Sequence, residues 1–172
     1  MTVKVGDAAP DFELFGERDP ETGAYRVYRL SEGLRQGPIL LHFFPAPFTR
    51  TCQVQMEGVR DHGEDLYGRQ GVRVWGVTGH YPWLILQWER EYSFGVPILA
   101  DYEHTVSEEY VGTYPADRMN GLRHTTKRGV IGVGADGVVR SVWVTDEPGV
   151  APSDEDLQAA IDAVEAGATP RV

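Results

Sequence analysis

Residues 38–52 read PILLHFFPAPFTRTC. The first eight of them, Pro38 to Pro45, form an almost entirely apolar run of strand length that is bounded by Gly37 and a proline. Such a run is typical of a strand that is buried on both faces of a sheet. We therefore expect a central strand here, and the remaining elements can be placed outward from it.

The segment after this run alternates between helical and strand patterns. Apolar residues interleaved with polar ones predict a helix through Arg69, and Gly71 stops the pattern. Further along the chain we expect strands at Val72–Thr78 and Val96–Leu99, helices at Pro82–Tyr92 and His104–Tyr110, and then a loop rich in Gly, Pro and Asn. This alternation predicts an α/β fold.

Two hairpins and a last helix complete the pattern. Asp19–Gly23 is a turn between short strands. Arg128–Val144 holds two strand-like runs joined by Ala135-Asp136-Gly137, a strong hairpin signal, so the sheet is expected to be mixed. Ser153, followed by acidic residues, predicts a capped terminal helix that ends just before Gly167.

Length and charge limit the function classes. A chain of 172 residues that is 41% hydrophobic predicts one domain over residues 1–172. The formal charge of -10 argues against a nucleic-acid partner. No segment approaches the roughly 20 apolar residues that a membrane helix needs. The start of the chain does not read as a signal peptide, so we expect a soluble, cytoplasmic protein.

Cys52 is the only cysteine in the chain. A single thiol excludes an intrachain disulfide and a cysteine-rich metal cluster. A lone cysteine is more often an inert buried thiol than a reactive one. Here, however, Thr49 can serve as the N-cap of the helix that follows the buried strand, which puts Cys52 in the first helical turn. The N–H groups and dipole of that turn favour a thiolate, so the position indicates a reactive sulfur.

The spacing Pro45-x-x-x-Thr49-x-x-Cys52 resembles the active-site motif of peroxiredoxins. The resemblance covers nearly the whole chain. VGDAAPDFEL is similar to the family's N-terminal segment, and VWGVTGHYPWLILQWEREYSFGVPILAD resembles its strand, helix and strand block. RGVIGVGADGVVR resembles the hairpin that supplies the family's catalytic arginine, which here is Arg128.

The resemblance implies a thioredoxin-like fold, with a mixed central sheet flanked by helices on both faces, and a reaction that needs no cofactor. The Cys52 thiolate would attack a hydroperoxide, release water or alcohol, and become a sulfenic acid. Arg128 would stabilise the thiolate and the charge on the leaving oxygen. Thr49 would hold the peroxide with its hydroxyl, and Pro45 would shield the sulfur.

Several positions depart from the family pattern. Gln55 stands where many members have a Glu that orients the arginine. Arg50 adds a cation near the sulfur, although a solvent-facing role is the more common one for such a residue. Because no second cysteine can resolve the sulfenic acid, the chain resembles the one-Cys group called alkyl hydroperoxide reductase E. An external thiol or a thioredoxin-like reductant would then regenerate Cys52.

The resemblance also implies self-association, as a homodimer or a higher homo-oligomer. Tyr81 and Trp83 would suit an interface formed by the loops around the active site. Trp88 on the same helix is expected to pack in the core, with a place in the wall of the peroxide pocket as the alternative.

Three other signals need a separate interpretation. Gly132, Gly134 and Gly137 spell GxGxxG, but a strand follows them where nucleotide binding requires a helix, so a hairpin is expected. His42 within the buried run is expected to be a satisfied core residue rather than a partner of the sulfur. The histidines show no ligand spacing, and we expect no metal; they are His42, His62, His80, His104 and His124.

Two functions from different classes stay open at this point. The first is a thiol-dependent peroxidase that reduces hydrogen peroxide or alkyl hydroperoxides. The second is a peroxide-responsive redox sensor or binding protein on the same scaffold, in which oxidation of Cys52 is the signal. The presence of Pro45, Thr49 and Arg128 together favours the peroxidase, because a binding domain has no need of all three.

Overall fold

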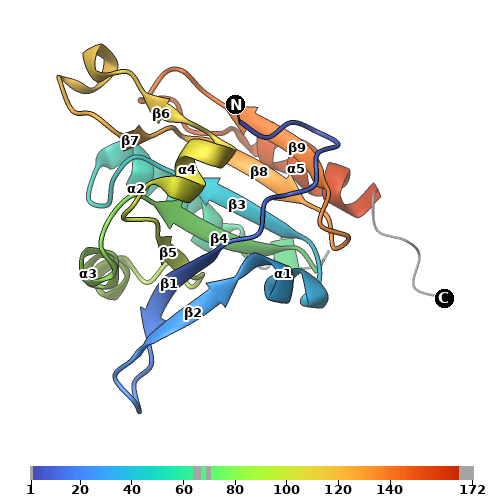
Figure 1. The fold of residues 1–172 in the computed structure, drawn as a ribbon, viewed down its shortest axis with the longest axis horizontal. Coiled ribbons are helices and arrows are strands. Elements are labelled where there is room, and N and C mark those ends of the chain that lie inside the picture. Colours follow the sequence, from blue (N-terminus) through green and yellow to red (C-terminus); the bar gives the residue numbers. More distant parts are fainter. Residues whose placement is uncertain (1, 64–66, 69–70, 167–172) are drawn as a thin grey trace.

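The computed structural model describes residues 2–63, 67–68 and 71–166. Its main feature is a seven-stranded sheet with the order β2-β1-β5-β4-β3-β8-β9 (Figure 1). These strands are β1 (Glu13–Arg18), β2 (Tyr25–Arg29), β3 (Ile39–Phe43), β4 (Arg73–Thr78), β5 (Ile98–Ala100), β8 (Gly129–Val133) and β9 (Val139–Val144). β3, β4 and β5 run parallel, and the other pairings are antiparallel. The expected mixed α/β sheet is confirmed.

β3 is a central strand, as its sequence predicts. All five of its residues are buried, and it pairs with β4 on one side and β8 on the other. His42 stands opposite Gly76 and Val130 in these two registers. β3 leads directly into the segment that carries Cys52, so the position of the sulfur is set by a fully buried strand at the centre of the sheet.

Helices cover both faces of the sheet, as the thioredoxin-like fold requires. One face packs against α2 (Arg50–Asp61), α3 (Pro82–Tyr92) and α5 (Asp154–Ala166). The other packs against α1 (Leu30–Gly33), the 3-10 turn η1 (Leu34–Gln36), α4 (Thr105–Tyr110) and the N-terminal segment. In Figure 1, α4 crosses in front of β3. Cys52 belongs to the core layer that α2, α3 and α5 form.

Some boundaries differ from the sequence-based expectation. The predicted first long helix is shorter, because α2 ends at Asp61; the expected end at Arg69 lies outside the described residues. The strand predicted at Val96–Leu99 is β5 at Ile98–Ala100, since Pro97 has no N–H for a ladder. The segment expected to be a loop holds two short paired strands and a 3-10 turn: β6 (Thr113–Tyr114), β7 (Thr125–Thr126) and η4 (Ala116–Met119).

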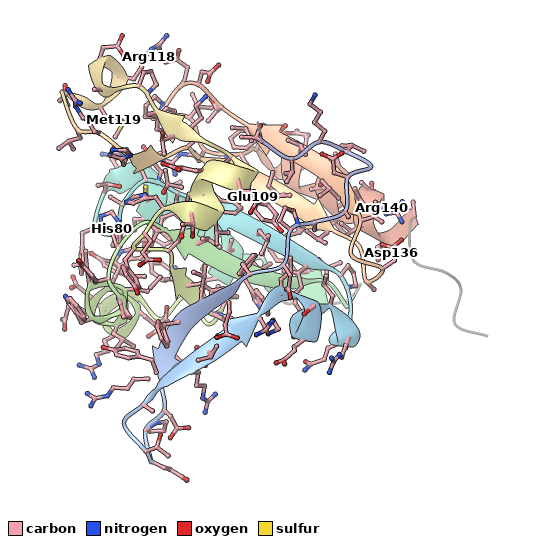
Figure 2. The ribbon with its side chains drawn as sticks, in the orientation of Figure 1. His80, Glu109, Arg118, Met119, Asp136 and Arg140 are labelled. Atoms are coloured by element: carbon pink, nitrogen blue, oxygen red, sulfur yellow. The ribbon has the colours of Figure 1, made fainter. Side chains whose placement is uncertain are left out.

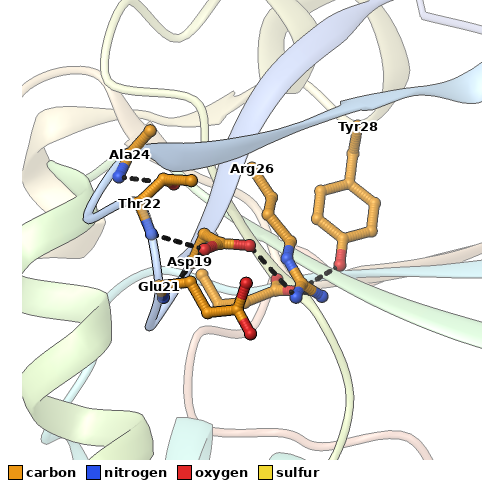
Figure 3. Close-up of polar contacts among 7 residues, drawn as sticks. Asp19, Glu21, Thr22, Ala24, Arg26 and Tyr28 are labelled. Carbon is orange, nitrogen blue, oxygen red and sulfur yellow. Dashed lines mark hydrogen bonds and ion pairs between the residues drawn. The ribbon is translucent and has the colours of Figure 1, made fainter.

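The β1–β2 hairpin forms where the turn Asp19–Gly23 is predicted. The Asp19 carboxylate accepts hydrogen bonds from the backbone N–H groups of Glu21 and Thr22, each at 2.9 Å (Figure 3). Such an Asx arrangement favours a tight turn. The hairpin also carries a bond from the Tyr28 hydroxyl to Glu17 at 2.6 Å.

The β8–β9 hairpin accounts for the GxGxxG pattern. β8 and β9 pair antiparallel, and Gly137 in the connecting turn has a φ of 78°, a conformation that favours glycine. Gly132 faces α5 closely, because a Cβ there would lie 2.7 Å from a Val164 methyl group. These glycines therefore serve a turn and a close packing contact.

The last helix, α5, is capped as predicted. The Ser153 hydroxyl accepts a hydrogen bond from the backbone N–H of Asp156 at 3.1 Å, and the Asp156 carboxylate accepts one from the Ser153 N–H at 2.8 Å. Gly167 lies outside the described residues. Among the helices in the described ranges, none is long and apolar enough to cross a membrane.

Candidate active site

Cys52 lies in the first turn of α2, which begins at Arg50. The residue is 1% exposed, and its sulfur is the only thiol of the chain. Thr49 directly precedes the helix with an extended backbone, as an N-cap residue does. Its side chain does not cap, which corrects the expectation: the Thr49 hydroxyl donates to the Ala46 carbonyl oxygen at 2.8 Å. The first-turn N–H groups are thus free of a side-chain acceptor.

The segment between β3 and α2 contacts the end of the neighbouring strand β4. Pro45 is buried, and its carbonyl oxygen accepts a bond of 3.5 Å from the Thr78 hydroxyl at the end of β4. Phe48 has a φ of 63°, which is uncommon for a residue with a bulky side chain. This turn carries the chain from β3 into α2 and brings Pro45 and Thr49 to the same cavity as the sulfur.

Arg128 precedes β8 and reaches across the site to Cys52. Its Nη2 lies 3.4 Å from Cys52 Sγ and 2.8 Å from the Pro148 carbonyl oxygen, and its Nη1 lies 2.7 Å from Gln55 Oε1. The residue is 1% exposed. No carboxylate within the described ranges comes within 4.0 Å of this guanidinium. The ionisable atom it contacts there is the sulfur.

An open cavity of about 530 Å³ contains all four predicted site residues, Pro45, Thr49, Cys52 and Arg128. Most of its lining surface is apolar, and Met119 and Leu122 form part of that wall. Of the described side chains that line the cavity, none is acidic, although the chain carries a net charge of -10; the cationic or titratable ones are Arg50, Arg123, Arg128, His80, His104 and His124.

The profile of the AhpC/TSA family matches residues 5–142. The chain belongs to this family. It is 31% identical to "Peroxiredoxin-2" of Mus musculus over 163 residues, which cover 91% of this chain and 77% of that protein. It is 29% identical to "Peroxiredoxin Bcp" of Escherichia coli over 109 residues, which cover 63% of this chain and 64% of that protein.

Solved structures show the same fold as this AhpC/TSA family member. Peroxidoxin BcpB from Mycobacterium tuberculosis superposes with a TM-score of 0.73 at 25% identity, covering 96% of this chain and 99% of that one. The reduced 2-Cys peroxiredoxin of Plasmodium vivax gives a TM-score of 0.76 at 19% identity, covering 94% and 82%. The recognition as a peroxiredoxin is confirmed, and the single cysteine fits the one-Cys type.

Three histidines gather at the cavity of this family member, which their spacing in the sequence does not predict. His80 lies between β4 and α3, His104 precedes α4, and His124 lies in the loop before β7. The His104 ring occupies the space where Gly79 lacks a Cβ. Burial and the neighbouring His104 lower the pKa of His80. Figure 2 shows His80 and Met119 at the end of the molecule where β3 leads into α2, away from Asp136 and Arg140 on the far hairpin.

No metal site is evident in the part of the chain that the structure describes. No group of three or more His, Cys, Asp or Glu side chains there is placed to hold a metal ion. His124 instead lies 3.6 Å from Glu108.

His42 differs from the satisfied core histidine that was expected. It is fully buried, and its Nδ1 faces the Nε2 of Gln55 at 3.4 Å. Its own Nε2 is buried with no hydrogen-bond partner among the described residues. Burial lowers the pKa of His42 to about 3, so the ring is neutral near pH 7. His42 therefore contacts Gln55, which in turn contacts Arg128 beside the sulfur.

Two further contacts of Arg128 could not be predicted from the sequence. The carbonyl oxygen of Pro148 accepts from the guanidinium, and the Tyr114 hydroxyl accepts from the Arg128 backbone N–H at 3.2 Å. Burial raises the pKa of Tyr114, so its hydroxyl keeps a proton to donate to the Thr145 carbonyl oxygen at 3.0 Å. Trp88 is fully buried against Phe44 and Phe94 and does not line the cavity, so it is a core residue.

Proposed function

We propose that this peroxiredoxin reduces hydroperoxides through Cys52 and that Arg128 is the group that activates the sulfur. The observation that carries the proposal is the 3.4 Å contact between Arg128 Nη2 and Cys52 Sγ in a buried site. A buried cation is strongly favoured when an anion lies beside it. The guanidinium and the first turn of α2 together favour the thiolate form of Cys52.

The reaction is a displacement at oxygen. The Cys52 thiolate attacks the terminal peroxide oxygen, an S–O bond forms, and the O–O bond breaks. The leaving oxygen takes both electrons of that bond, gains a proton, and departs as water or an alcohol. The sulfur is oxidised to the sulfenic acid and the peroxide is reduced. Arg128, which donates to the sulfur, is also placed to stabilise charge that grows on the oxygens beside it.

Thr49 and Pro45 have supporting roles in this proposal. The Thr49 residue lines the cavity at the start of α2, and its O–H donates a hydrogen bond to the Ala46 carbonyl oxygen. The hydroxyl oxygen can therefore still accept a hydrogen bond from the peroxide. In that arrangement Thr49 is a hydrogen-bond acceptor for the peroxide O–H. Buried Pro45 forms part of the wall next to the sulfur and limits the approach of other reactants.

The cavity is compatible with more than hydrogen peroxide. Its volume of about 530 Å³ and its apolar wall at Met119 and Leu122 can accept the alkyl group of an organic hydroperoxide. We therefore include alkyl hydroperoxides among the substrates.

The reductant comes from outside the chain in this proposal. With one thiol, no intrachain disulfide can trap the sulfenic acid on Cys52. A small thiol or a thioredoxin-like protein must therefore regenerate it. Since such reductants are maintained in reducing compartments, we also place the protein in the cytoplasm.

A second copy of the chain is the partner we propose for the exposed aromatic side chains beside α3. Tyr81 stacks on Trp83 with ring centroids 4.6 Å apart and on Tyr102 at 5.4 Å. Trp83 is 61% exposed and Tyr81 is 52% exposed. Rigid aromatic surfaces of this kind are enriched at protein interfaces. Sedimentation should show that the wild type is a dimer and that the Trp83→Ser dimer dissociates at higher protein concentrations. A wild type that is monomeric at all concentrations contradicts the proposal.

The test of the peroxidase function compares wild type with Cys52→Ser. Stopped-flow tryptophan fluorescence should follow oxidation of the wild type by hydrogen peroxide and by an alkyl hydroperoxide, and the rates should rank the two substrates. Cys52→Ser, nearly the same size, should keep its circular dichroism spectrum and lose peroxide consumption completely, because its hydroxyl is hardly ionised near neutral pH. Peroxide consumption by the variant at the wild-type rate would refute the assignment.

Mass spectrometry then separates turnover from signalling. One equivalent of peroxide without added thiol should give a species about 16 Da heavier, which a sulfenate-reactive dione captures. Added thiol should return the original mass. A quantitative disulfide-linked dimer on non-reducing electrophoresis would instead favour the redox sensor.

A further inference from the structure

We propose that His42 is a positioning residue: it fixes the amide of Gln55 so that the Gln55 oxygen faces Arg128 and holds the guanidinium on the sulfur. This inference rests on the proposed function of Cys52 and adds a residue to its machinery. It is carried by a chain of contacts from the central strand to the sulfur, which runs through His42 Nδ1, Gln55 Nε2, Gln55 Oε1, Arg128 Nη1, Arg128 Nη2 and Cys52 Sγ.

The orientation of Gln55 follows from donor and acceptor chemistry. A guanidinium has donors only, so the group that meets Arg128 at 2.7 Å must be the amide oxygen. The NH₂ group of Gln55 must then point to the other side, where it lies 3.4 Å from His42 Nδ1. If the amide were reversed, its NH₂ would face the guanidinium and two donors would oppose each other.

The state of His42 must match this orientation. An NH₂ group needs an acceptor, so Nδ1 of His42 must carry no proton and the ring must be the neutral tautomer with its proton on Nε2. The low pKa of His42, caused by its burial, agrees with a neutral ring. Nε2 has no acceptor among the described residues, so the contact with Gln55 is the one that selects the tautomer.

This device solves a problem that a carboxylate at position 55 would not have. The two oxygens of a carboxylate are equivalent, so either can accept from Arg128 without being oriented. An amide can bind Arg128 in only one of its two flipped orientations, and a second group must fix that orientation. Gln55 is 5% exposed and His42 is completely buried, so water is poorly placed to make that choice.

A double-mutant cycle tests the proposal. His42→Leu, which removes the acceptor, should slow the reaction of Cys52 with hydrogen peroxide about fivefold, as expected for loss of one neutral hydrogen bond. In the Gln55→Glu background the same change should alter the rate less than twofold, because a carboxylate needs no orientation. An equal loss in both backgrounds would overturn the proposal.

Leu40→Ala is the matched control. Leu40 lies two residues earlier on β3, on the same face of the sheet, and is fully buried in the same core layer without a polar contact. This variant should lower the urea midpoint and leave the peroxide rate of the folded protein within twofold. If it slows the reaction as much as His42→Leu does, the effect belongs to general packing and the positioning role fails.

A spectroscopic readout covers the case in which His42→Leu does not fold. A long-range ¹H–¹⁵N spectrum of the unaltered protein at pH 7 should show the His42 ring neutral, with its proton on Nε2. A proton on Nδ1, or an imidazolium, would overturn the proposal. This readout does not depend on activity, so it remains decisive even if Cys52 proves not to reduce peroxide.

Discussion

Nη1 of Arg128 lies 2.7 Å from Oε1 of Gln55, so the side chain that anchors the buried guanidinium carries no charge of its own. A carboxylate in that place would neutralise part of the arginine's field. With a neutral anchor, the positive charge of Arg128 remains directed at the sulfur, 3.4 Å away.

Replacing Arg128 by Met should leave a folded protein that reacts on the order of 10²-fold more slowly with hydrogen peroxide, because a charge-assisted donor is lost at the transition state. Alkylation of Cys52 by iodoacetamide at pH 7 should also slow, because the cation that lies 3.4 Å from the sulfur is removed. Arg123→Met is the control, since Arg123 is exposed at the same cavity. Similar losses in both variants would assign the effect to the general charge of the cavity.

Thr49→Val should slow the peroxide reaction by roughly fivefold to tenfold, since in the proposed mechanism the hydroxyl accepts one hydrogen bond from the peroxide. Thr49→Ser keeps that hydroxyl and should stay within twofold of the wild type. Stopped-flow measurements on both variants decide the point. Because Thr49 is exposed and does not cap α2 with its side chain, the urea midpoint should change little in either variant. A rate for Thr49→Val equal to that of wild type argues against substrate contact.

Acid should destabilise the protein in part through His42. The folded-state pKa of about 3 lies below the ordinary 6.5, so between these values the unfolded chain binds a proton that the folded chain does not. The contribution of His42 to the free energy of unfolding is therefore fully present above pH 6.5 and is lost as the pH drops toward 3. His42→Leu lacks this contribution and should show a shallower decline in urea midpoint from pH 7 to pH 4. Parallel declines in the two proteins would mean that His42 titrates normally.

Gly132→Ala should lower the free energy of unfolding by about 1–3 kcal/mol, the usual effect of overpacking. The added methyl group would meet the Ser141 hydroxyl and lie 2.7 Å from Val164 and 3.2 Å from Leu40. Gly58→Ala is the control, because a Cβ there meets nothing within 4 Å, and it should not be destabilising. Thermal unfolding of the two variants measures the difference. An unchanged melting temperature for Gly132→Ala would mean that β8 and α5 can separate slightly without loss.

The elements that the sequence predicts best are those whose pattern depends on burial. β3 is recognisable because a strand covered on both faces must be apolar, and α3 because Pro82 begins it and its apolar side chains recur at helical spacing. α2 ends at Asp61, earlier than predicted, because the alternation of polar and apolar residues continues past Asp61 and does not mark where the helix ends.

The candidate site is predictable only where local chemistry determines it. The motif Pro45, Thr49 and Cys52 occupies one strand-to-helix turn, so its residues meet at a predictable place. Pro148 and His124 reach the cavity through loops that follow distant strands, and their position depends on tertiary packing that no spacing records. The contact between the Gln55 amide and the neutral His42 ring depends on how α2 packs against β3, which the sequence alone does not determine.

The burial of Arg128 makes the melting temperature a reporter of the oxidation state of one atom. In the proposed cycle a thiolate on Cys52 would balance the guanidinium and a neutral sulfenic acid would not, so the first oxidation should weaken the native state by leaving a buried charge without its counter-ion. Further oxidation produces a sulfinate, which is again an anion. The doubly oxidised, inactive protein should therefore melt at a higher temperature than the singly oxidised one. The same electrostatic contact that prepares the sulfur for reaction would then make the inactivated form the more durable of the two.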